Sequence, residues 1–139
     1  MNIGKWLAVG GIILGGWGVA LADEQEDKKD FATAGKMYFE QYCASCHGMG
    51  AKGDGPVGTT LRTKPADLTT LTKRKGVDGK FPLLYVVQTI DGRTQIGAHG
   101  PIEMPVWGRE LTDRSGGRSY MARSMIRAIA HYIQTLQEK

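Results

Sequence analysis

Apolar side chains at helical spacing predict three helices in this chain. The pattern is clearest from Ser119 onward, where apolar residues recur every three or four positions, at Ala122, Met125, Ile126, Ile129, Ile133 and Leu136. Ser119 is placed to cap the start of this helix. A second helix is predicted over residues 31–43, with apolar or aromatic side chains at Ala34, Met37, Tyr38 and Tyr42. The third, over residues 82–90, begins at a helix-compatible proline and stops before an Asp-Gly pair.

The segments between these helices predict loops. Residues 48–81 and 92–118 are rich in glycine and proline and show no sustained alternation of polar and apolar positions, so no strand is predicted there. Glycine is the commonest residue, with 20 of 139. We therefore expect an all-α domain with three or more helices, whose loops wrap around a bound group rather than build a sheet.

The first 22 residues have the pattern of a secretory signal. A single lysine precedes an uncharged apolar run over residues 6–22, which ends in Ala-Leu-Ala and is followed by an acidic segment. We expect cleavage after Ala22, which makes residues 1–22 a signal peptide and residues 23–139 one exported, periplasmic domain. The alternative is an uncleaved N-terminal membrane anchor that faces the periplasm, although about 25 Å of helix is short for a hydrocarbon core of about 30 Å.

Residues 43–47, Cys-Ala-Ser-Cys-His, carry the most specific chemistry in the chain. Two thiols on one helical turn can each add to a vinyl group of haem, and the next histidine can then bind the iron. Cys43 and Cys46 are the only cysteines, so none remains for a zinc site. The motif predicts one covalent haem c with His47 as an axial ligand, and the plainer alternative is a single disulfide.

Methionine is the predicted ligand on the opposite haem face, because thioether sulfur binds haem iron. Met104 lies in a loop between two prolines, far along the chain from His47. The other methionines lie in the signal, on predicted helices where packing is expected, or too close to the histidine: Met1, Met37, Met49, Met121 and Met125. His99, in the same loop, is the alternative ligand and would give a haem of lower potential. Trp107 is expected to pack on the haem or to donate its indole N–H to a propionate.

Two weaker signals remain. Residues 48–53 fit G-x-G-x-x-G, the dinucleotide-binding pattern, but they follow a predicted helix rather than a strand, so we set that function aside. The formal net charge of +4 is too small to indicate a dedicated nucleic-acid binder. Lys73, Arg74 and Lys75 form a basic run that we expect to lie in a solvated loop and to help dock an acidic redox partner.

Taken with the motif, these segments resemble the small monohaem class I cytochromes c of bacteria over nearly all of residues 23–139. The similar positions are Gly35, Phe39, Cys43, Cys46, His47 and Gly48, with residues 53–56, 64–68, 104–108 and 130–133. The resemblance implies an all-α cytochrome c fold with long Gly/Pro-rich loops around one covalent haem. It also implies that Gly35 and Phe39 pack on the C-terminal helix near Tyr132.

The expected coordination decides the expected function. Iron bound by His47 and Met104 has no open position for a substrate, and the sequence offers no paired carboxylates or nucleophile–base pair. We therefore expect no enzyme and no small-molecule substrate, but a periplasmic one-electron carrier that meets redox partner proteins. One alternative is a haem c subunit of a larger periplasmic or membrane-bound oxidoreductase complex. Another is a five-coordinate haem protein that binds a small gas such as NO or CO.

Overall fold

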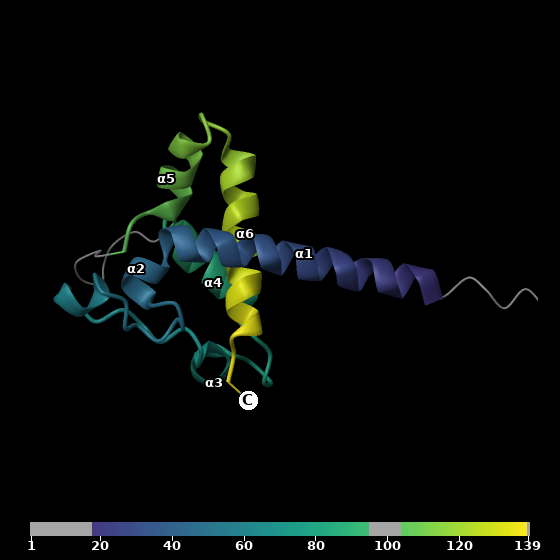
Figure 1. Cartoon of the computed structure of the whole chain (residues 1–139), viewed down its shortest axis with the longest axis horizontal. Helices are drawn as coiled ribbons and strands as arrows, with labels where there is room; N and C mark the ends of the chain where they lie inside the picture. The colour runs from purple at the N-terminus through teal and green to yellow at the C-terminus, as the bar shows by residue number, and fades with distance from the viewer. Residues whose placement is uncertain (1–17, 95–103, 139) are drawn as a thin grey trace, which may run out of the picture.

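The computed structural model describes residues 18–94 and 104–138, with side chains from residue 29 onward. The described chain is helical (Figure 1), and its elements are α1 Gly18–Tyr42, α2 Ala44–His47, η1 Gly58–Thr60, α3 Leu71–Lys75, α4 Leu83–Asp91, α5 Trp107–Arg114 and α6 Ser119–Thr135. Within these ranges the only strand-like pairing is an isolated antiparallel bridge between Val77 and Lys80. The all-α prediction is confirmed.

The long helices α1 and α6 cross and form the framework of the domain (Figure 1). Gly35 lies at the crossing, where an added Cβ would clash with the backbone carbonyl of Ala128. One turn later, the fully buried ring of Phe39 lies 5.4 Å from the ring of Tyr132. The absence of a side chain at Gly35 therefore lets the two helices approach closely, as the resemblance implied.

Helix α1 begins earlier than the sequence pattern predicts. The predicted helix started at Phe31, whereas α1 starts at Gly18 and runs through Ala22 without a break. Cleavage after Ala22 would therefore remove only the first residues of α1, and the division into residues 1–22 and 23–139 stays a prediction. None of the helices in the described residues is long and apolar enough to cross a membrane.

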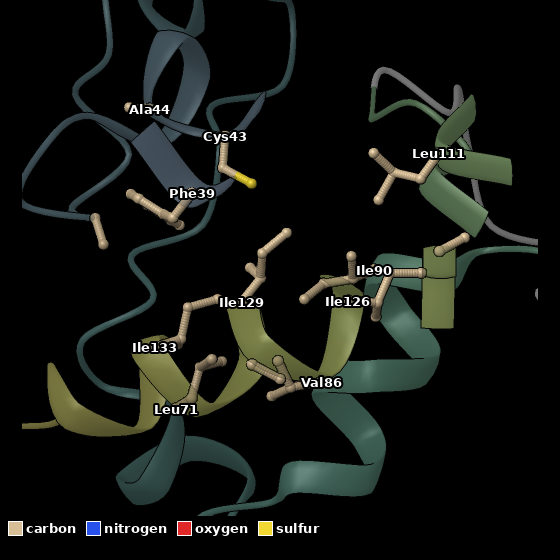
Figure 2. Packing of buried hydrophobic residues seen from close by; sticks show 13 residues of the cluster. Phe39, Cys43, Ala44, Leu71, Val86, Ile90, Leu111, Ile126, Ile129 and Ile133 are labelled. Atoms are coloured by element: carbon tan, nitrogen blue, oxygen red, sulfur yellow. The ribbon is translucent and has the colours of Figure 1, made fainter. Parts of the chain in front are cut away.

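The core forms around one face of α6, which packs against α1, α4 and α5. Figure 2 shows the contributing side chains: Ile126, Ile129 and Ile133 from α6, Val86 and Ile90 from α4, Leu111 from α5, Leu71 from α3 and Phe39 from α1. The 3.6-residue spacing of α6 thus matches its buried stripe. The predicted cap is wrong, because Ser119 is the first helical residue and the cap position is Arg118, which makes no side-chain capping bond.

Short helices occupy parts of the predicted loops. Helices α3 and α5 contain 5 and 8 residues, too few to show a clear period in the sequence. Lys73, Arg74 and Lys75 are exposed as expected, but they form the end of α3 rather than a loop. Trp107 starts α5, so the predicted loop over residues 92–118 is partly helical.

Candidate functional site

The two cysteines lie where α1 passes into α2. The backbone N–H of Cys43 donates to the Phe39 carbonyl at 2.8 Å, and the Cys43 carbonyl accepts from the N–H of His47 at 2.9 Å. This turn brings Cys43, Cys46 and His47 together at the end of α1. Both cysteines are free thiols, with Cys43 buried and Cys46 half-buried. Burial raises the pKa of the Cys43 thiol to about 12, with a smaller contribution from Cys46, so the unreacted thiol is neutral at pH 7.

His47 is held by a backbone carbonyl. Its Nδ1 lies 3.0 Å from the carbonyl oxygen of Ala66, which can only accept, so Nδ1 carries the proton and Nε2 keeps its lone pair. Burial lowers the pKa of His47, and the hydrogen bond to Ala66 opposes that shift only in part. The neutral ring with a carbonyl on Nδ1 is the form that metal-binding histidines use in proteins.

The loop after α2 folds back over the cysteine turn. The N–H groups of Gly53, Gly55 and Val57 donate to the carbonyls of His47, Cys46 and Ser45 at 2.8, 3.1 and 2.9 Å. Gly53 has φ +77°, and a Cβ there would clash with the Pro65 carbonyl. The residues that fit G-x-G-x-x-G therefore form a turn that braces the histidine. The resemblance to the class I cytochromes c included residues 53–56 and residues 64–68 as separate segments and did not indicate that the two segments are in contact.

Met104 and Trp107 lie at or just before the start of α5, far along the chain from the cysteine turn. Met104 is half-buried and packs against the hydrophobic core to which Cys43 belongs. The ring of Trp107 lies 5.5 Å from that of Tyr42, the residue before Cys43. The structure thus brings the start of α5 next to the end of α1. Iron ligation by Met104 and a haem contact by Trp107 stay predictions, and His99 lies outside the described residues.

The environments of the other methionines correct one step of the sequence argument. Met37 and Met121 were expected to pack in the interior, but their exposed fractions are 66% and 40%. Met125 does pack against the core, and Met49 is 64% exposed. For Met37, a place on a predicted helix did not predict burial. Gly35 and Phe39 lie on the buried face of α1, and Met37 does not.

An ion pair that the sequence did not reveal lies between α4 and α5. Arg93 Nε and Nη2 each donate to a carboxylate oxygen of Asp91 at 2.7 Å, and these bonds lower the pKa of Asp91. A Cβ on Gly108 would lie only 2.5 Å from Asp91 Oδ1 and Arg93 Nε. The pair therefore rests against the first turn of α5. The sequence marked the Asp-Gly pair only as a helix stop.

The residues present fit a covalently held haem. Two free sulfurs lie on one turn, the next residue is a neutral histidine with Nε2 available, and the half-buried Met104 belongs to the same core. Figure 2 shows the Cys43 sulfur directed toward the part of the core that Ile129 and Leu111 line. As iron donors, the thioether sulfur of Met104 and the imidazole of His47 suit haem iron rather than a hard cation.

Comparisons with known proteins identify a c-type cytochrome family. The family model described as cytochrome C oxidase, cbb3-type, subunit III matches residues 30–116, which include Cys43, Cys46, His47 and Met104. The Cbb3-type cytochrome c oxidase subunit CcoP of Rhodobacter capsulatus is 31% identical over 105 residues. That alignment covers 76% of this chain and 29% of the relative, so the chain spans less than a third of the relative's length. No solved structure gives a significant match.

Proposed function

Because the chain belongs to the c-type cytochrome family of cytochrome C oxidase, cbb3-type, subunit III, we propose that it is a one-electron carrier with one haem c. Membership implies a covalently bound haem c and a role in electron transfer. In the finer proposal, Cys43 and Cys46 form the two thioether bonds, and His47 and Met104 bind the iron. When bound, the haem supplies a one-electron Fe(III)/Fe(II) couple.

The observation that carries this proposal is the geometry of His47. Its Nδ1 is engaged by Ala66 at 3.0 Å directly after two free cysteines on one turn, which leaves Nε2 as the only ring nitrogen for a metal. The fully buried side chains of Phe39 and Leu111 exclude water from the neighbouring core. A closely packed core without water favours electron transfer, because the protein around the iron then reorganises little between the two oxidation states.

A role as a subunit of an oxidase complex is the second candidate. The observation that favours it is the match to proteins described as oxidase subunits, one of which is much longer than this chain. In either role the protein itself transfers electrons and meets redox partner proteins. The basic end of α3 is a proposed docking site, because Lys73, Arg74 and Lys75 are all exposed and an acidic partner would be attracted to them.

Mass spectrometry of the protein matured in a host able to attach haem tests the proposal. We expect the chain plus one haem, retained after acid–acetone extraction, and a reversible one-electron redox titration. Replacement of both cysteines, Cys43→Ser with Cys46→Ser, should abolish attachment. Haem that is freed by acid–acetone would contradict covalent binding. Recovery from the native host separates the two roles, since a free carrier elutes as a monomer and a subunit co-purifies with its complex.

A further inference from the structure

The side chain of Gln137, just after α6, connects the end of α6 to the loop that precedes α3 and to the first turn of α3. Its Oε1 accepts hydrogen bonds from the backbone N–H of Thr72 at 2.8 Å and from the Thr72 hydroxyl at 3.2 Å. Its Nε2 donates to the carbonyls of Leu68 at 2.7 Å and Ile133 at 2.9 Å. Both protons and the oxygen of the amide are therefore used.

The next residue adds to the same connection. The backbone N–H of Glu138 donates to the Thr69 carbonyl at 2.9 Å. Among the residues whose side chains the structure describes, Thr69 is the one buried polar residue, and its hydroxyl is 2.6 Å from Asp67 Oδ1 and 3.4 Å from Glu138 Oε1. Residues 68–72 are thus fixed to the end of α6 by several short bonds, and α6 is itself anchored in the core.

The same loop carries the hydrogen-bond partner of His47. The Ala66 carbonyl accepts from His47 Nδ1, and two residues later the N–H of Leu68 donates to the Ala51 carbonyl at 2.8 Å. Leu68 is therefore bonded on one side to the turn after His47 and on the other side to Gln137. A shift of Leu68 would move the Ala66 carbonyl, because only one residue separates them.

We propose that Gln137 is a positioning residue for His47: it holds Leu68 and Thr72 so that the Ala66 carbonyl meets Nδ1. This inference rests on the proposed function, in which His47 binds the haem iron. A carbonyl on Nδ1 makes a metal-bound imidazole more basic, which favours Fe(III). Loosening the loop weakens that hydrogen bond and raises the reduction potential.

The experiment compares Gln137→Ala with wild type and with Gln134→Ala in the haem-loaded protein. Gln134 is an exposed glutamine near the same end of α6, so its replacement controls for loss of a helix-end amide. Removal of a partner of a metal-bound histidine changes affinity or activity by about tenfold or more. For the indirect Gln137→Ala change we expect the Fe(II)/Fe(III) ratio at a fixed ambient potential to rise about three- to tenfold. Tenfold corresponds to about 59 mV for one electron.

A spectroscopic readout separates positioning from mere stabilisation. The NMR signals of the His47 ring should shift in Gln137→Ala and stay unchanged in Gln134→Ala. Gln137→Met keeps a side chain of similar length and adds no charge, but it can neither accept from Thr72 nor donate to Leu68, so it should shift the potential in the same direction. It also serves as the test if the alanine variant does not fold.

A lower denaturation midpoint with an unchanged potential and unchanged His47 signals would show that Gln137 only stabilises the fold, and the inference would be wrong. Failure of the proposed function looks different. In that case wild type itself carries no covalent haem, or it keeps its axial-histidine signals after His47→Ala.

Discussion

In the proposed coordination, Met104 decides whether the iron site is open or closed. It is half-buried in the core that contains Cys43, and nearby Trp107 contacts the end of α1. We expect Met104→Ala to remove the sulfur-to-iron charge-transfer band of the oxidised protein and to lower the reduction potential, because methionine raises the potential. The reduced variant should also bind CO, whereas we expect wild type not to. Visible spectroscopy and a redox titration measure these changes.

Met125→Ala is the matched control for this prediction. Met125 is also half-buried against the core, so its loss should cost stability and leave the charge-transfer band in place. His99→Ala tests the alternative ligand. The assignment of Met104 is wrong if His99→Ala alters the axial spectrum and Met104→Ala does not. If wild type already binds CO readily, the closed-site argument fails and gas binding becomes the better function.

At this scale the sequence predicts the site only where chemistry needs particular side chains. Cys43, Cys46 and His47 are recognisable because attachment to haem requires two thiols and a histidine at fixed spacing. The Ala66 carbonyl leaves no trace in the sequence, since any residue supplies a carbonyl and the partner lies 19 positions away. Gln137 is hidden for the same reason, because three of the four hydrogen bonds of its side chain involve backbone groups of other residues.

The crossing of α1 and α6 is a contact between elements that should be sensitive to substitution. Gly35→Ala would place a Cβ against the Ala128 carbonyl, and a backbone atom in a helix cannot move aside easily. Overpacking of this kind costs about 1–3 kcal/mol. We therefore expect a lower free energy of unfolding by about that amount in a denaturant titration of the haem-loaded protein.

Gly50→Ala is the control for the helix crossing. Gly50 is exposed, and a Cβ there would meet only the Lys52 side chain at 4.0 Å, so the midpoint should stay close to wild type. Equal losses in the two variants would contradict the close approach of the helices as the cause, because a Gly→Ala change by itself reduces the entropy of the unfolded chain and does not lower stability. An unchanged midpoint in Gly35→Ala would show that α1 and α6 can separate at little cost.

The predictability of each element follows from how it is stabilised. Helices α4 and α6 carry buried residues at helical spacing, so this spacing predicted nearly their observed bounds. Helix α5 buries only Leu111 and Gly108, which produce no period in eight residues. Short helices form because they pack on the rest of the domain, and the sequence of a short helix does not reveal which residues it will contact. The early start of α1 was missed because residues 23–30 are all polar and show no apolar period.

At the scale of the whole molecule, the core contacts of α1 are separate from residues 1–22. The α1 contacts that hold the fold, at Gly35 and Phe39, come well after Ala22, and in Figure 1 the early part of α1 extends beyond α6. The domain should therefore keep its structure when residues 1–22 are removed. A free carrier and a subunit of a complex can therefore share this domain.

We expect the protein in its native host to begin at Asp23, because residues 1–22 have the charge, apolar run and Ala-Leu-Ala end of a cleaved signal. N-terminal sequencing of material from the periplasmic fraction measures this. A variant matured to begin at Asp23 should match the full chain in absorption spectrum and denaturation midpoint, since none of the core residues is lost. Ala20→Arg with Ala22→Arg should block cleavage and hold the protein at the membrane. Recovery of wild type only in detergent extracts, with Met1 or Asn2 still present, would instead identify the segment as an anchor and favour the subunit role.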